Sequence, residues 1–137
     1  MKPNVLVLRA DGINRDEELK YAFDIAGGNA KIVHINDLRE KNDSLKNYQI
    51  LAFPGGFAYG DDIVSGKILA NELTSFLKDE MQKFLQRKDT LMFGCCNGFQ
   101  VLVRTGILPF QHIGDMDVTL TNNDSHFESR WVPLKYE

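Results

Sequence analysis

The sequence predicts an α/β fold, an open and mostly parallel sheet with helices on both faces. Two observations favour it. Short apolar runs alternate with longer segments whose apolar residues recur at helical spacing. Glycine-containing turns follow several of these runs, and repeated β-α-β units imply a parallel sheet covered by helices. With 137 residues, 43% of them hydrophobic, the chain can bury the core of one domain spanning residues 1–137.

The elements follow one another along the first two-thirds of the chain. Short apolar runs predict strands at residues 5–8, 31–35, 50–53 and 90–93. Helical spacing predicts a helix over 15–26, closed by Gly27-Gly28, and a long stretch over 63–87 with a break near Ser65-Gly66 or Lys78-Asp79. A further helix begins near Phe99. After Gly106 the pattern favours antiparallel or irregular β structure, at 118–120 and 127–132.

A possible nucleophile stands between the fourth strand and the last helix. Gly94-Cys95-Cys96-Asn97-Gly98 has the Gly-x-nucleophile-x-Gly spacing of a nucleophile elbow, with Cys96 at its centre. The glycines allow a strained central residue and a close approach of strand and helix. A sulfur at the N-terminus of a helix is favoured as the thiolate, which attacks amide and ester carbonyls.

A glycine loop directly after the third strand suits the same chemistry. Acyl transfer through a cysteine passes through an oxyanion, which needs two N–H donors. Asn97, next to the nucleophile, would supply one, and Gly56 in the Pro54-Gly55-Gly56 turn would supply the other. Because strand carboxyl ends share one edge of a parallel sheet, Asp11-Gly12, this loop and Cys96 should converge on one site.

Bulk properties exclude several classes of protein. The net charge of −3 offers no electrostatic surface for nucleic acid, and no apolar run has the length of a membrane span. No signal peptide precedes the first strand, and no Cys/His group has the spacing of zinc ligands. Two adjacent cysteines cannot form an ordinary disulfide framework. We therefore expect a cytoplasmic protein without a metal site.

Segments along nearly the whole chain carry a resemblance to a known family. Residues 8–14, 33–36, 53–61 and 94–100 occur in the order found in the glutaminase subunit or domain of phosphoribosylformylglycinamidine synthase, a class I glutamine amidotransferase. Residues 106–109 and 122–132 are also similar to that family. The Cys-Asn-Gly-Phe-Gln elbow and the Pro-Gly-Gly-Phe-x-Tyr-Gly-Asp loop are the most specific of these motifs.

The resemblance implies that L-glutamine is hydrolysed to glutamate and ammonia through a thioester on Cys96. The ammonia would serve formylglycinamidine ribonucleotide synthesis in purine biosynthesis, on a synthetase that is a separate subunit or a fused domain. ATP and magnesium would bind that synthetase, and this domain would need no cofactor. The resemblance implies oxyanion donors at Gly56 and Asn97 and substrate-binding residues at Gly55, Phe57, Gln100, Phe127 and Arg130.

Two features depart from the family. Arg15 stands where its members often have cysteine. The triad of the family is completed by a His-x-Glu pair well downstream, which is missing here, so the sequence reads as the N-terminal part of a type-1 amidotransferase domain, C-terminally incomplete and poorly active alone. His126-Phe127-Glu128 has the required spacing but falls in the segment that resembles the glutamine-binding region, so a surface role is favoured for His126.

Two alternative functions remain open on the sequence. One is a catalytically inactive short paralogue that acts as a binding or regulatory subunit. The other is a different intracellular cysteine hydrolase, against which residues 57–61 and 97–100 argue. Some residues near these motifs are expected to have structural roles. Cys95 is expected to pack into the sheet, and the acidic Asp11, Asp61 and Asp62 are expected to form turns or helix caps.

Overall fold

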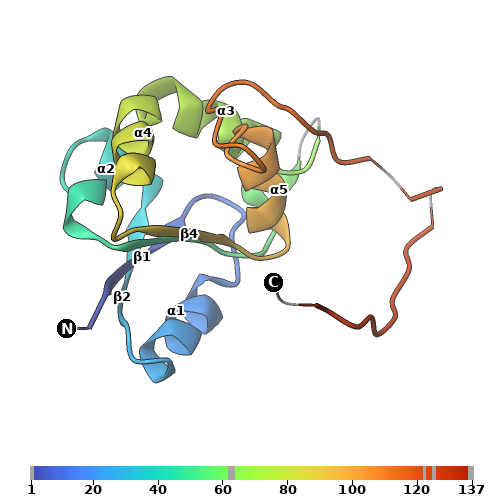
Figure 1. The fold of residues 1–137 in the computed structure, drawn as a ribbon, viewed down its shortest axis with the longest axis horizontal. Coiled ribbons are helices and arrows are strands. Elements are labelled where there is room, and N and C mark those ends of the chain that lie inside the picture. Colours follow the sequence, from blue (N-terminus) through green and yellow to red (C-terminus); the bar gives the residue numbers. More distant parts are fainter. Residues whose placement is uncertain (1, 62–63, 122, 125, 136–137) are drawn as a thin grey trace.

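A single sheet of four parallel strands organises the chain, in the order β2-β1-β3-β4 (Figure 1). The computed structural model describes residues 2–61, 64–121, 123–124 and 126–135. The strands are β1 (Asn4–Arg9), β2 (Asn29–His34), β3 (Ile50–Phe53) and β4 (Leu91–Gly94). The helices are α1 (Asp16–Ile25), α2 (Ile35–Arg39), α3 (Lys67–Phe76), α4 (Lys78–Gln86) and α5 (Asn97–Arg104), with short helical turns η1 (Leu45–Asn47) and η2 (Ala58–Asp61).

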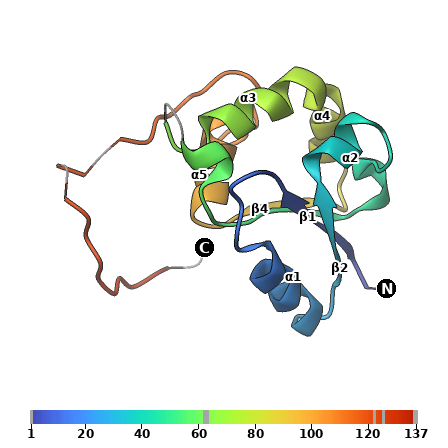
Figure 2. The same cartoon turned by 180° about the vertical axis from the view of Figure 1, so that it is seen from behind.

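The central strand β1 is apolar on both sides because helices cover both faces of the sheet. Leu6 and Leu8 belong to the larger core, which α2 to α5 cover, whereas Val5 and Val7 face a smaller core under α1. All four side chains are fully buried. Figures 1 and 2 show α1 alone on one side of the sheet and the other helices on the opposite side. The predicted α/β architecture is confirmed.

β4 is an edge strand, and helices cover only one of its two faces. Its residues Leu91 and Phe93 align with Ile50 and Ala52 of β3, on the face that carries α1. Leu91 remains 56% exposed and Phe93 40%, although the Phe93 ring meets that of Phe23 edge-on, at 5.8 Å between centroids. A single ten-residue helix is too narrow to cover four strands, so this face stays open beside β4.

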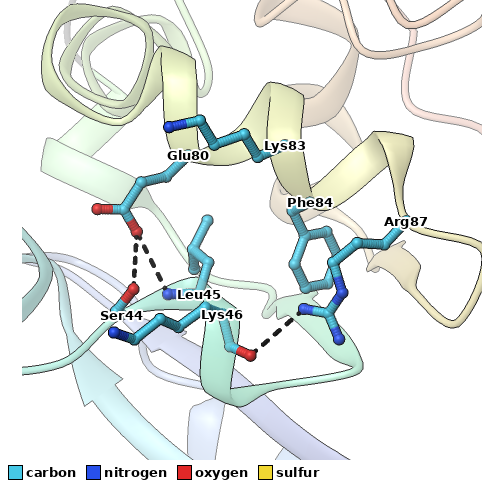
Figure 3. Close-up of a pocket in the computed structure, with 7 residues that line it drawn as sticks. All are labelled: Ser44, Leu45, Lys46, Glu80, Lys83, Phe84 and Arg87. Atoms are coloured by element: carbon cyan, nitrogen blue, oxygen red, sulfur yellow. Dashed lines mark hydrogen bonds between the residues drawn. The ribbon is translucent and has the colours of Figure 1, made fainter.

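Hydrogen bonds join the turn η1 to helix α4, at the end of the sheet where β3 and β4 begin. The Glu80 carboxylate accepts from the Ser44 hydroxyl at 3.2 Å and from the Leu45 N–H at 3.4 Å (Figure 3). At the other end of the helix, Arg87 donates to the backbone oxygens of Lys46 and Tyr48. A cavity of about 270 Å³ remains between them. Ligands of parallel sheets bind at the opposite, carboxyl end of the strands, so this cavity is structural.

The strands predicted before Gly106 and the helices that became α1 and α5 agree with the structure in type, and their boundaries shift by at most two residues. The strand expected to reach Ile35 ends at His34, whose Nδ1 accepts from the N–H of Asn36 and caps the unpredicted helix α2. The long helical stretch is two helices, and Leu77 separates α3 from α4, beside the predicted break at Lys78-Asp79. The alternative break at Ser65-Gly66 is wrong, because Gly66 immediately precedes the first of these helices. Its predicted start at residue 63 lies outside the described residues.

The β structure predicted after Gly106 is wrong for the described part of the chain. Residues 118–120 and 127–132 form no strand, and the chain after α5 loops outward from the domain as an irregular tail before it turns back (Figures 1 and 2). Phe127, Trp131 and Leu134 are almost completely exposed. Alternating apolar residues form a strand only where a neighbouring strand accepts their backbone hydrogen bonds, and this tail meets none among the described residues.

A buried acid stabilises the loop between α2 and η1. The Asp43 side chain is 9% exposed and accepts hydrogen bonds from Lys31, Tyr48 and the Ser44 N–H at 2.7–2.8 Å. Burial alone would raise the pKa of Asp43, but these three hydrogen bonds outweigh it and hold the pKa at about 2. No helix within the described residues is long and apolar enough to cross a membrane.

Replacing Gly98 by alanine is expected to destabilise the fold by about 3 kcal/mol or more. A Cβ there would lie 2.0 Å from the Phe53 oxygen, so α5 would have to move away from β3. Gly27→Ala is the control, because Gly27 has a positive φ of 98° but no atom within 4 Å of the added Cβ. It should cost only about 1–2 kcal/mol of backbone strain. Equal losses in urea unfolding would contradict the close approach of strand and helix.

Replacing Asp43 by asparagine should remove a stabilisation that depends on pH. The folded pKa of about 2 lies below the usual value of 3.8, so the charged form stabilises the fold fully above pH 5 and loses this effect as the pH falls towards 2. Because Lys31 is exposed, we expect a difference of about 1–2 kcal/mol at pH 6, shrinking between pH 5 and pH 2 in urea unfolding. The exposed Asp115→Asn is the control, and a difference independent of pH would contradict the assignment.

Candidate functional site

Three loops meet at the carboxyl edge of the sheet, where the sequence placed them. They follow β1, β3 and β4, and helix α1 forms a further wall. A cavity of about 750 Å³ opens between them. Its lining consists of Asn14, Arg15, Glu18, Leu19, Ala22, Gly55, Gly56, Phe57, Asp61, Ser65, Cys95, Cys96, Gln100 and Phe127. This volume suits a small metabolite.

Cys96 has the backbone conformation that a nucleophile elbow requires. Its φ of 53° and ψ of −115° are strained for a residue with a side chain, and it is the residue immediately before helix α5. The turn is fixed on both sides: the Cys95 N–H donates to the Phe53 oxygen at 3.1 Å, and the Gly98 N–H donates to the Cys95 oxygen at 2.9 Å. The Cys96 thiol is free, exposed and open to the cavity.

The glycine loop is held against the loop that follows β1. The Phe57 N–H donates to the Gly12 oxygen at 2.9 Å, and Gly56 pairs with Ile13 in an isolated antiparallel bridge. Gly56 has a φ of 138°, and a Cβ there would lie 2.8 Å from the Asn14 nitrogen, so both conformation and space require glycine. A Cβ on Gly55 would lie 3.4 Å from Cys96 Cβ, so the loop passes directly beside the nucleophile.

Both predicted oxyanion donors are available. Among the described residues, neither the Gly56 N–H nor the Asn97 N–H has a hydrogen-bond acceptor. For Asn97 this follows from its place in the first turn of α5, where backbone N–H groups have no partner within the helix. Both residues border the cavity or adjoin Cys96. Their role as donors stays a prediction.

The side chain of Asn97 connects the elbow to the glycine loop. The sequence did not predict this role. Asn97 is 2% exposed; its Oδ1 accepts from the Ala58 N–H at 3.2 Å, and its Nδ2 donates to Asp61 at 3.0 Å and to the Gln100 Oε1 at 3.1 Å. Asp61 also accepts from the Ser65 hydroxyl and the Gly66 N–H. Asp61 therefore forms a turn, as predicted, and the network holds Gln100 at the cavity wall.

Helix α1 contributes a charged wall to the cavity. Arg15, the residue before the helix, donates from Nη1 to Glu18 Oε1 at 2.6 Å. Leu19 and Ala22 continue the same wall. Cys95 lines the cavity with them, so the expectation that Cys95 packs into the sheet is wrong. Because β4 is an edge strand whose α1 face is open, the residue that follows it meets a cavity instead of a second layer.

The predicted substrate-binding residues are only partly brought together. Gly55, Phe57, Gln100 and Phe127 line the cavity. Arg130 does not; it lies in the tail and pairs with Glu128 at 3.3 Å.

No imidazole lines this cavity, and all three histidines belong to the described residues. His34 caps α2, and His112 Nδ1 lies 2.8 Å from Asp117. His126 is exposed in the tail, as predicted for a surface residue. Within the described residues, no three His, Cys, Asp or Glu side chains group as metal ligands. The cavity therefore offers a thiol and N–H donors without a histidine base.

Comparisons with known proteins agree with this geometry. The family model of the CobB/CobQ-like glutamine amidotransferase domain matches residues 2–137. Phosphoribosylformylglycinamidine synthase subunit PurQ of Dehalococcoides mccartyi is 47% identical over 134 residues, which are 97% of this chain and 52% of that protein. The PurQ subunit of Treponema denticola is 42% identical, over 98% of this chain and 54% of that protein. The chain thus spans about half the length of the curated relatives it matches.

A longer relative and a solved structure extend the comparison. Phosphoribosylformylglycinamidine synthase of Dictyostelium discoideum is 36% identical over 97% of this chain, which is 10% of that protein. The structure of PurLQS from Thermotoga maritima matches with a TM-score of 0.66 and 31% identity, over 81% of this chain and 48% of the matched chain. Fold, elbow and sequence agree: the chain belongs to the CobB/CobQ-like glutamine amidotransferase domain family.

Proposed function

We propose that this chain carries the nucleophile part of a glutaminase, which releases ammonia from L-glutamine for formylglycinamidine ribonucleotide synthesis. The observation that carries the proposal is Cys96, strained and exposed at the start of α5, beside the Gly55-Gly56 loop in one cavity. The relatives' names support the biosynthetic role, since those proteins are phosphoribosylformylglycinamidine synthases or their PurQ subunits.

In the first chemical step, the Cys96 sulfur attacks the side-chain amide carbon of glutamine. The carbonyl oxygen becomes an oxyanion, to which the N–H groups of Gly56 and Asn97 donate. The C–N bond then breaks, the nitrogen takes up the proton that the Cys96 thiol has given up and leaves as ammonia, and a γ-glutamyl thioester remains on the sulfur. Water hydrolyses the thioester to glutamate and restores the thiol. Gln100 contributes to the cavity wall beside the bound amino acid, whereas Phe127 reaches the cavity from the exposed tail.

The partner is a synthetase, which would use ATP and magnesium to incorporate the ammonia. The relatives favour both arrangements of this partner, because some are named as a subunit whereas the Dictyostelium protein matches over only 10% of a much longer chain. Ammonia is lost once it is protonated and released to water, so a partner that closes the open cavity serves the reaction. No cofactor is assigned to the chain itself.

Cys96 should be labelled by a diazoketone analogue of glutamine, 6-diazo-5-oxo-L-norleucine, which places an electrophilic carbon beside the attacking sulfur. We expect one adduct, located at Cys96 by peptide mass spectrometry and suppressed by excess L-glutamine. Cys95→Ser is the matched control: it should keep the adduct, whereas Cys96→Ser should lose it. An adduct on Cys95, or none where iodoacetamide still alkylates Cys96, would contradict the proposal.

The chain alone should turn glutamine over very slowly. The cavity lacks a histidine among the described residues, and a positioned general base contributes roughly 10²–10⁴-fold to the rate. We therefore expect an acyl-enzyme at most and little steady release of ammonia in a coupled assay. Full turnover would refute the expectation, and its loss in His126→Ala would make His126 the base.

A further inference from the structure

The cavity beside Cys96 holds one complementary pair of charges on its α1 wall. Among the described residues that line it, Arg15 is the only cation. The two carboxylates are Glu18 and Asp61, and Asp61 is already engaged by Asn97, Ser65 and Gly66. Among the described residues, the side chain of Glu18 pairs only with that of Arg15. A ligand in this cavity therefore meets one cation and one anion that are paired with each other and are engaged by no further side chain of the described residues.

The substrate of the proposed reaction has the matching charges. The α-carbon of glutamine, two methylenes away from the amide carbon, carries an ammonium and a carboxylate. These two charges distinguish glutamine from primary amides that are not amino acids. When they enter a cavity, the water around them must be replaced by protein partners. A glutaminase therefore needs partners for both charges beside its nucleophile, and a cation next to an anion can supply them.

The Arg15–Glu18 pair lines the same cavity as Cys96, and the stem of Arg15 lies close to the nucleophile. A Cβ on Gly55 would be 3.4 Å from Cys96 Cβ and 3.7 Å from Arg15 Cγ, so the stem of Arg15 lies just across the glycine from the sulfur. The guanidinium continues beyond this stem towards Glu18, which lies one turn into α1. The charges are thus displaced from the nucleophile in the direction of the helix.

Both groups have hydrogen-bonding capacity left for a ligand. Arg15 uses Nη1 for Glu18, and its other N–H donors have no acceptor among the described residues. Glu18 receives that bond on Oε1, and its own backbone N–H also donates to the carboxylate, while no other side chain of the described residues does. The hydrogen bond from Arg15 also lowers the pKa of Glu18, so the carboxylate is charged at neutral pH.

We propose that Arg15 binds the α-carboxylate and Glu18 the α-ammonium of the glutamine that Cys96 attacks, which makes this pair the amino-acid specificity element of the site. The assignment rests on the proposed function and extends it to substrate recognition. A planar guanidinium can hold a carboxylate through two parallel hydrogen bonds, and charge-assisted bonds of this kind are the strong ones.

Labelling of Cys96 separates recognition from reactivity. In Arg15→Ala, 6-diazo-5-oxo-L-norleucine should label Cys96 at least about tenfold more slowly, because its carboxylate loses its partner. Iodoacetamide, which has no charge to recognise, should react at an unchanged rate. Lys20→Ala is the matched control, since Lys20 forms a 2.6 Å ion pair with Asp24 on the same helix and does not line the cavity.

Ligand analogues test which charge each residue binds. Glutaric acid monoamide lacks the α-ammonium, and 4-aminobutanamide lacks the carboxylate; each is measured as a protector of Cys96 against iodoacetamide. In the wild type, 4-aminobutanamide should protect Cys96 about tenfold or more less strongly than glutamine does. In Arg15→Ala, the two ligands should protect almost equally, because the partner of the carboxylate is gone. Glu18→Ala should show the same coupling with the ammonium. The assignment would be overturned if removing a charge from the ligand weakened protection by the same factor in the wild type and in both variants.

The two proposals fail in different ways. If the wild type is not labelled by the diazoketone although iodoacetamide alkylates Cys96, the glutaminase proposal fails. If the wild type is labelled with glutamine protection, and Arg15→Ala is labelled equally fast, only the recognition proposal fails. Circular dichroism of each variant shows whether α1 is intact, so a slower rate in a folded variant supports recognition.

Discussion

The candidate site depends on one close approach, that of helix α5 to the end of strand β3. The Phe53 oxygen accepts from the Cys95 N–H, and a Cβ on Gly98 would lie 2.0 Å from that oxygen. Only glycine allows the first turn of the helix to pass the strand so closely. This contact forces the sharp turn between β4 and α5, and that turn gives Cys96 its positive φ. The exposed thiol is thus a consequence of packing beneath it.

The Asn97 side chain extends this constraint from the elbow to the loops around it. By accepting from Ala58 and donating to Asp61 and Gln100, one buried amide joins the helix to the turn η2. An amide has both donors and an acceptor, so it can hold a backbone N–H and a carboxylate together, which neither Asp nor Leu of similar size can do. The position of the glycine loop relative to the sulfur is therefore maintained by hydrogen bonds, and its conformation by Gly56.

Sequence periodicity predicted the strands of the sheet and the helical segments that became α1, α3, α4 and α5. The spacing of Gly94, Cys96 and Gly98 predicted the elbow, because this motif is also local. The Asn97 network escaped prediction, since it depends on the path of η2, where Tyr59 and Gly60 have left-handed conformations that no periodicity encodes. The prediction that Cys95 packs into the sheet is wrong because its exposure depends on β4 being an edge strand. The β structure predicted for the tail is wrong because it rests on alternation alone, whereas a strand also needs a neighbouring strand to pair with.

The wall that carries Arg15 is positioned by the strand next to it. Arg9, the last residue of β1, donates to Asp16, the first residue of α1, and to Glu17 at 3.0 Å. Asp16 is 5% exposed, and no side chain caps the helix, so this ion pair is the main polar anchor of its first turn. Arg15 immediately precedes Asp16. The distance between the charges on α1 and Cys96 is therefore set by β1 on one side and β4 on the other, two strands held in register by β3. A rigid sheet can keep that distance constant even though Arg15 and Glu18 are themselves exposed.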